Sequence, residues 1–144
     1  MKICLFGGTF DPPHIGHLLI AQTVCEAESF DKILFIPVNI PPHKKVNTLL
    51  EDRLKMLDIA IEDNPNFEMS DIEIKRGGVS YTIDTIKILK KKYGIKGNEI
   101  SYLIGSDSLL NFHKWKNAEQ ILEECQVIVA IRPGFRPSDI PAWI

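Results

Sequence analysis

Two histidines stand three residues apart, directly after a glycine-rich segment near the N-terminus. Residues 7–17 read Gly-Gly-Thr-Phe-Asp-Pro-Pro-His-Ile-Gly-His. The segment joins a short apolar run to a helical pattern, a position in which backbone N–H groups and the helix dipole favour an anion. On a helix, the side chains of His14 and His17 would point about 60° apart and share one face. This pattern predicts a phosphate site lined by two imidazoles.

Two plainer interpretations compete with the phosphate site. A glycine pair after a strand is often only a turn, and a single histidine on a helix is usually solvated or packed. Zinc is a weaker alternative, because the cysteines are remote and no Glu adjoins the histidine pair. We therefore predict no metal ligands. Gly16 stands between the two histidines, and its missing side chain is expected to leave room for a bulky ligand.

Short apolar runs alternate with helical patterns along the chain. The predicted strands are Lys2–Phe6, Lys32–Pro37, Phe67–Ile74, Glu99–Ile104 and Gln126–Ile131. Four helices are predicted, and two of them are given by their ranges, His14–Glu28 and about Asn117–Glu124. The other two are indicated by apolar residues at helical spacing. These residues are Leu50, Leu54, Leu57 and Ile61 in one helix, and Ile83, Ile86, Leu89 and Tyr93 in the other, which Gly94 closes. Because parallel strands need crossover connections, this alternation predicts a doubly wound α/β fold with a parallel sheet.

Ligands of such sheets bind beyond the carboxyl ends of the strands, which here are the loops after Phe6, Pro37, Ile104 and Ile131. Lys44 follows a proline pair in the second loop and suits a phosphate, although a solvated surface lysine is the plainer interpretation. Asp107 follows Gly105 in the third loop and suits ribose hydroxyls, or it is a helix N-cap.

Two further residues stand out for their chemistry. Thr82 precedes a helical pattern and is predicted to be its N-cap. Trp115 lies in a polar, basic stretch, where an indole face could attract a cationic ring by about 0.5–2 kcal/mol or simply pack half-buried.

The composition narrows the class of protein. The 144 residues include 17 basic and 19 acidic side chains, for a formal charge of −2, which does not favour nucleic acid. The apolar runs are too short to span a membrane, and the N-terminus lacks the pattern of a signal peptide. The three scattered cysteines are predicted to be buried free thiols in a reducing, cytoplasmic compartment.

Residues 7–17 resemble the nucleotide-binding segment of the nucleotidyltransferase superfamily whose hallmark is His-x-Gly-His, and the full string is similar to bacterial nicotinate-nucleotide adenylyltransferase. That resemblance implies a Rossmann-like nucleotidyltransferase fold. It also implies adenylyl transfer from ATP, with Mg²⁺, to nicotinate mononucleotide, giving nicotinic acid adenine dinucleotide and pyrophosphate. It runs from Met1 to about Phe135, so residues 1–144 are expected to form one domain without the C-terminal helical segment of the family and its [ST]-[ST]-x-x-R motif.

The resemblance also implies roles for individual residues. The implied catalytic residues are His14, His17 and Lys44. The implied ATP-binding residues are Gly7, Gly8, Thr9, Phe10, Gly16, Gly105, Asp107 and Arg132. The implied nicotinate mononucleotide-binding residues are Thr82, at the pyridine carboxylate, Trp115, against the ring, and Lys116, where several family members have an aromatic residue.

Two other functions remain open from the sequence. One is phosphopantetheine adenylyltransferase, which shares His-x-Gly-His, although the Pro-Pro pair and the Lys-Trp segment favour the pyridine nucleotide. The other is a nucleotide-binding protein in which the shortened C-terminus impairs catalysis. A homo-oligomer is also possible, since the edge left by the missing helical segment would favour self-association.

Overall fold

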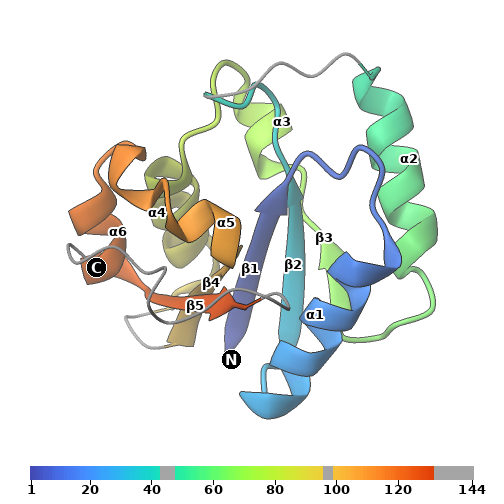
Figure 1. Ribbon diagram of the computed structural model, residues 1–144, viewed down its shortest axis with the longest axis horizontal. Coiled ribbons are helices and arrows are strands. Elements are labelled where there is room, and N and C mark those ends of the chain that lie inside the picture. Colours follow the sequence, from blue (N-terminus) through green and yellow to red (C-terminus); the bar gives the residue numbers. More distant parts are fainter. Residues whose placement is uncertain (43–47, 96–98, 132–144) are drawn as a thin grey trace.

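The computed structural model describes residues 1–42, 48–95 and 99–131, and within them the chain forms a parallel sheet of five strands (Figure 1). The strands are β1 (Ile3–Gly8), β2 (Lys32–Pro37), β3 (Phe67–Met69), β4 (Ile100–Gly105) and β5 (Gln126–Ala130), in the spatial order β3-β2-β1-β4-β5. The chain moves outward from β1 through β2 to β3, then crosses back to β4. The topological switch point therefore lies between β1 and β4, where doubly wound sheets bind ligands.

Helices cover both faces of the sheet. On one face lie α1 (Ile15–Ala27) and α2 (Leu50–Ile61). On the other lie α3 (Ile72–Arg76), α4 (Thr82–Tyr93), α5 (Ser106–Leu109), the 3-10 turn η2 (Phe112–Lys114) and α6 (Ala118–Glu124). Successive strand residues point to opposite faces, so Ile3 and Leu5 join one core cluster while Cys4 and Phe6 join the other. The predicted doubly wound fold is confirmed.

The prediction that one strand runs from Phe67 to Ile74 is wrong in its second half. β3 ends at Met69, and Ile72–Arg76 forms the short helix α3. The alternating pattern of Ile72-Glu73-Ile74 suggests a strand, but Glu73 is the residue that is buried, at 3% exposure. The hydroxyl of Thr85 on α4 donates a hydrogen bond of 2.7 Å to Oε2 of Glu73. This contact between distant segments overrides the local periodicity.

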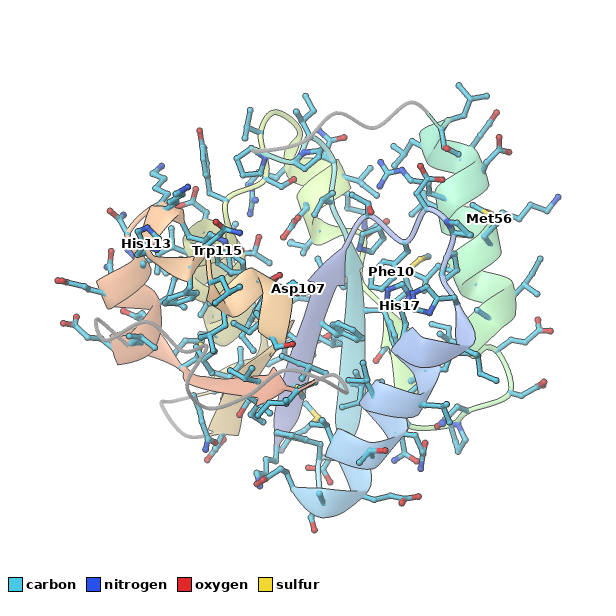
Figure 2. All side chains as sticks on the ribbon, viewed as in Figure 1. Phe10, His17, Met56, Asp107, His113 and Trp115 are labelled. Carbon is cyan, nitrogen blue, oxygen red and sulfur yellow. The ribbon has the colours of Figure 1, made fainter. Side chains whose placement is uncertain are left out.

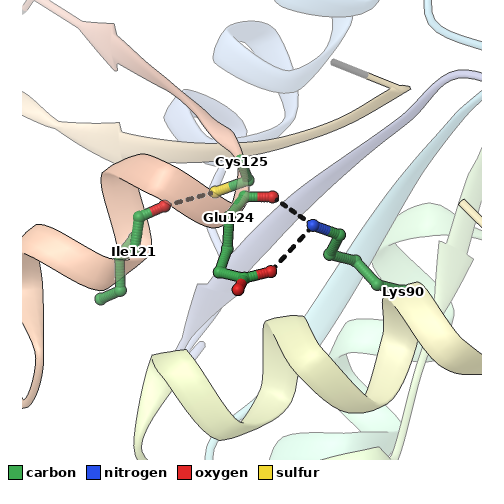
Figure 3. A network of polar contacts seen from close by, with 4 residues as sticks. All are labelled: Lys90, Ile121, Glu124 and Cys125. Carbon is green, nitrogen blue, oxygen red and sulfur yellow. Dashed lines mark hydrogen bonds and ion pairs between the residues drawn. The ribbon is translucent and has the colours of Figure 1, made fainter. Parts of the chain in front are cut away.

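A polar bridge fixes α6 against α4 (Figure 3). The ammonium of Lys90 donates to the backbone oxygen and to carboxylate Oε2 of Glu124, each at 2.8 Å. The hydrogen bond from Lys90 also lowers the pKa of Glu124. Next to it, the Cys125 thiol donates to the carbonyl of Ile121 at 3.5 Å. The bridge fixes the C-terminal end of α6, just before β5 begins at Gln126.

All three cysteines are buried and unpaired, as predicted. Burial raises the pKa of Cys4 to about 12 and that of Cys125 to about 11, so these thiols stay protonated near neutral pH. Protonated, buried thiols are poor nucleophiles, so neither Cys4 nor Cys125 is suited to nucleophilic catalysis. Within the described ranges, no helix is long and apolar enough to cross a membrane.

Candidate active site

A cleft of about 670 Å³ lies at the carboxyl ends of the strands. It is lined by the ends of β1 and β4, the loops that follow β1 and β2, and the start of α4. The loops after Phe6, Pro37 and Ile104 are three of the four loops that the sequence predicted as ligand sites. Figure 2 shows Phe10 and His17 on the α1 side of β1 and Trp115 on its other side, with Asp107 between them. The cleft thus has a histidine end and a tryptophan end.

The two histidines at the start of α1 orient each other. His14 is the N-cap residue, and its Nδ1 accepts from the backbone N–H of Gly16 at 3.1 Å. The Nδ1 of His17 accepts from the backbone N–H of His14, also at 3.1 Å, and the two rings stack with centroids 3.8 Å apart. Because each Nδ1 is an acceptor, the proton of each neutral ring resides on Nε2. Both side chains line the cleft, where an Nε2–H is suited to donate to a ligand.

Aromatic side chains surround His17. Its ring meets those of Phe6 and Phe10 edge to face, at centroid distances of 6.0 and 5.4 Å. Burial lowers the pKa of His17, and the neighbouring His14 adds to the effect. The free protein therefore holds His17 neutral at pH 7, as a hydrogen-bond donor rather than a cation.

Gly16 makes room for His14. A Cβ at this position would lie 2.8 Å from Cε1 and 2.9 Å from Nδ1 of the His14 ring. From the sequence, the missing side chain is expected to leave room for a ligand. In the structure the nearest neighbour is the imidazole, which folds back over the helix start to cap it.

Replacing Gly16 with alanine should therefore displace the His14 ring and lower kcat about tenfold, while the melting temperature changes little. The ring can swing away into the cleft, so the fold tolerates the methyl group but the orientation of Nε2 is lost. Steady-state kinetics and thermal melting check this. Gln22→Ala on the same helix is the matched control, and equal kcat for Gly16→Ala and this control would contradict the prediction.

The backbone at the end of β1 is closely covered from both sides. A Cβ on Gly7 would lie 2.3 Å from the hydroxyl oxygen of Tyr102 on β4, and one on Gly8 would touch the Phe10 ring at 3.4 Å. Burial raises the pKa of Tyr102, so this hydroxyl stays neutral, and it shares a hydrogen bond with Thr82. Only glycine at position 7 lets strand and tyrosine approach so closely. The sequence pattern gives no signal for Tyr102, which looks like an ordinary strand residue.

Arg53 is a second residue near the cleft that was not among the predicted site residues. It is only 3% exposed, and its Nη1 donates to the carbonyl oxygens of Thr9, at 3.1 Å, and Val38, at 3.0 Å. Arg53 thereby ties α2 to the loops that follow β1 and β2. A signal existed, since Arg53 shares the apolar face of α2 with Leu57.

The tryptophan end of the cleft is built from α4 and the segment after η2. Trp115 is half-buried and packs against Tyr102 and Phe112, with centroid distances of 6.2 and 5.2 Å. Thr82 and Lys116 line the same end. The predicted N-cap role of Thr82 is wrong, because Tyr81 is the N-cap and Thr82 already lies in the first turn. Its hydroxyl turns to Tyr102 instead.

Glu73 also reaches this cleft and was not predicted. Its Oε1 is buried without a hydrogen-bond partner in the described part of the chain, whereas Oε2 accepts from Thr85. Burial raises the pKa of Glu73, against hydrogen bonds and the nearby Arg76 that lower it. The cleft therefore has a buried carboxyl group on its wall, with a pKa above its ordinary value.

The structure brings together most of the residues that the sequence singled out. Those that line the cleft are Gly7, Gly8, Thr9, Phe10, His14, His17, Thr82, Gly105, Trp115 and Lys116. Gly16 and Asp107 are not among its lining residues, and the N-cap of α5 is Gly105 rather than Asp107. Lys44 and Arg132 lie outside the described residues, although Pro41 and Pro42, just before Lys44, line the cleft.

The fold and cleft define a class, a nucleotide-binding α/β domain with a pair of histidines at the first helix. The cytidylyltransferase-like family matches residues 5–143. The nicotinate-nucleotide adenylyltransferase of Bacillus subtilis is 42% identical over 136 residues, covering 93% of this chain and 71% of its own. A protein of Aquifex aeolicus assigned by name to the same enzyme is 46% identical over 132 residues, covering 91% of this chain and 77% of its own. The chain therefore belongs to the nicotinate-nucleotide adenylyltransferases of the cytidylyltransferase-like family.

A crystal structure from Vibrio parahaemolyticus, of a protein assigned to the same enzyme, has the same fold. The superposition has a TM-score of 0.76 at 28% identity, and covers 92% of this chain and 76% of the other. The doubly wound sheet is thus shared with this solved structure.

Proposed function

We propose that this protein transfers the adenylyl group of ATP to nicotinate mononucleotide, releasing pyrophosphate and forming nicotinic acid adenine dinucleotide. The observation that carries the proposal is the single cleft that joins the histidine pair to Trp115. Phosphate-binding groups at one end and an aromatic face at the other fit a substrate with a phosphate and a pyridinium ring. The buried free cysteines fit a reducing compartment, so we propose that the reaction takes place in the cytoplasm.

The proposed reaction needs no covalent enzyme intermediate. The 5′-phosphate oxygen of nicotinate mononucleotide attacks the α-phosphorus of ATP in line, and the bond to the pyrophosphate oxygen breaks. The Nε2–H groups of His14 and His17 donate to phosphoryl oxygens, where negative charge grows in the transition state. Gly7 and Gly8 let the phosphates approach the backbone. Lys44, which lies outside the described residues, is proposed to add a positive charge to the same phosphates.

The rest of the cleft positions the substrates. Trp115 is proposed to hold the pyridinium ring by a cation–π contact, near Thr82 and Lys116. Gly105 at the end of β4 is proposed to contact adenosine, with Asp107 and Arg132 as further candidates. Holding both reactants in one cleft converts a bimolecular reaction into a reaction within one complex. This proximity is the main source of rate acceleration when no covalent catalysis is needed.

Mg²⁺ is proposed to arrive with ATP. In the part of the chain that the structure describes, no three His, Cys, Asp or Glu side chains gather to hold a metal ion. The described lining of the cleft thus offers no metal cage of its own, and the ion would be held mainly by phosphate oxygens and water, as suits its hard, octahedral coordination.

ATP binding should be accompanied by proton uptake. His17 is neutral in the free protein because burial lowers its pKa, and a bound triphosphate would raise that pKa by attracting the imidazolium. Between the lowered and the raised pKa the complex binds more protons than the free protein, so uptake should be measurable near pH 6.5. Calorimetry in buffers of different ionisation enthalpy counts these protons. The same uptake in His17→Gln, which cannot titrate, would contradict the assignment to His17.

Pyrophosphate release tests the proposed function. The assay contains ATP and Mg²⁺ with nicotinate mononucleotide, nicotinamide mononucleotide or 4′-phosphopantetheine. We expect the fastest release with nicotinate mononucleotide. Release with phosphopantetheine alone would instead identify the other adenylyltransferase. ATP binding without release from any substrate would identify a nucleotide-binding protein.

A further inference from the structure

Phe10 is buried beside the histidine that is proposed to act on the phosphates (Figure 2). The resemblance implies that Phe10 binds ATP, but the residue is only 3% exposed, and its ring meets the His17 imidazole edge to face with centroids 5.4 Å apart. We propose that Phe10 is a positioning residue, whose ring fixes the orientation of the His17 imidazole rather than contacting the nucleotide. This inference rests on the proposed function, because it explains how His17 is held for that reaction.

The backbone of Phe10 has an unusual conformation for a bulky residue. Its φ is 48°, in the left-handed region that glycine adopts freely and aromatic residues rarely adopt. Such a conformation persists only where the surroundings hold it, and it is often found at functional sites. The peptide before Phe10 is fixed by Arg53, which donates to the Thr9 carbonyl at 3.1 Å. In this conformation the Phe10 side chain joins the core cluster on the α1 and α2 face of the sheet.

The ring of Phe10 is packed against three neighbours besides His17. It meets Phe6 on β1 edge to face at a centroid distance of 5.8 Å, and it meets Phe35 on β2 at 5.7 Å. It also lies against the backbone of Gly8, where an added Cβ would touch the Cζ atom of the ring at 3.4 Å. A ring enclosed in this way has little freedom to move, so it presents a rigid surface to the imidazole.

The His17 imidazole is restricted by this surface and by two other rings. Phe6 meets it at a centroid distance of 6.0 Å, and His14 stacks on it at 3.8 Å. Its Nδ1 accepts from the backbone N–H of His14, which puts the proton of the neutral ring on Nε2. Of the two phenylalanine contacts, that with Phe10 is the shorter, so Phe10 contributes most to holding Nε2 in one place. The burial that these contacts produce also lowers the pKa of His17.

An NMR titration tests the contact and does not require activity. The Hε1–Cε1 signal of His17, assigned by its absence in His17→Gln, reports the pKa of the imidazole. In Phe10→Gly we expect this pKa to rise toward its ordinary value, because the ring that shields the imidazole from water is lost. Glycine adopts the left-handed φ freely, so the loop keeps its path. Phe10→Ala should show the same rise in pKa but melt at a lower temperature than Phe10→Gly.

Kinetics separate positioning from direct nucleotide binding. In the same variants we expect kcat to fall about tenfold or more, because the reacting group is no longer held in place. The calorimetric Kd for ATP should change by less than about threefold, as when an interaction specific to the transition state is lost. Phe10→Leu serves if the smaller side chains prevent folding, and it should show the same two effects at reduced size. A weaker Kd for ATP, with kcat and the pKa of His17 unchanged, would identify a nucleotide contact and overturn the proposal.

Phe35→Leu is the matched control. Phe35 is fully buried in the same aromatic cluster, so Phe35→Leu loses similar packing but keeps the contact between Phe10 and His17. We expect it to lower the melting temperature and to leave kcat and the pKa of His17 close to those of the unmodified protein. An equal pKa shift in Phe35→Leu and Phe10→Leu would overturn the role of Phe10.

The titration distinguishes failure of this inference from failure of the proposed function. If the unmodified protein is active, a folded Phe10 variant in which either kcat or the pKa of His17 is unchanged overturns the positioning role and leaves adenylyl transfer standing. If the unmodified protein releases no pyrophosphate, the proposed function fails, and the titration alone decides on Phe10. A raised pKa of His17 then still supports the contact, and an unchanged pKa overturns it.

Discussion

Replacing His17 with alanine should lower kcat about a thousandfold and leave the fold intact. The substitution removes an Nε2–H that is proposed to donate to the reacting phosphoryl group, and single donors of this kind contribute about two to three orders of magnitude. It also removes the acceptor for the backbone N–H of His14, which is exposed enough to bind water instead. Because the side chain is only partly buried, the melting temperature should change little.

His113→Ala provides the matched control for His17→Ala. His113 is exposed on η2, outside the lining of the cleft, so its loss should leave kcat unchanged. Rates from pyrophosphate release, together with circular dichroism of both variants, complete the comparison. A kcat for His17→Ala within threefold of the unmodified protein would remove His17 from the proposed reaction.

Replacing Arg53 with methionine should lower the free energy of unfolding by about 2–4 kcal/mol. Methionine has a similar length but donates no hydrogen bond, so the carbonyl oxygens of Thr9 and Val38 both lose their Arg53 contact. Hydrogen bonds to a charged donor contribute about 1.5–3 kcal/mol each, and the apolar replacement recovers part of the loss. ATP affinity should fall as well, because Thr9 belongs to the loop proposed to hold the phosphates.

Lys55→Met on the exposed side of α2 controls for removing a positive charge from the same helix. Urea unfolding of the two variants gives the difference directly. Arg53→Lys, which keeps the charge and part of the donor capacity, should lie between Arg53→Met and the unmodified protein. Equal stability of Arg53→Met and Lys55→Met would show that the two carbonyl contacts contribute nothing measurable.

The sequence alone determined the parts of this protein that depend on short stretches of chain. The glycine pair, the following helix start and the spacing of His14 and His17 predict a phosphate site without reference to any distant residue. The apolar periodicity of α2 and α4 and the alternation of strands with helices predict the doubly wound sheet, and with it the edge at which the cleft is found. Strand ends were predicted less well, since β1 continues through both glycines.

Only the tertiary structure decided which residues far apart in sequence meet at the cleft. Tyr102 covers Gly7, Arg53 reaches Thr9, and Glu73 turns inward to Thr85 and makes a helix of a segment that alternates like a strand. Each contact depends on strand order and register, which place β1 between β2 and β4. Local sequence patterns indicate how a segment forms its own backbone hydrogen bonds and which of its faces is apolar and becomes buried. The partner of a buried arginine or carboxylate is set by the packing of the whole sheet, and so becomes visible only in three dimensions.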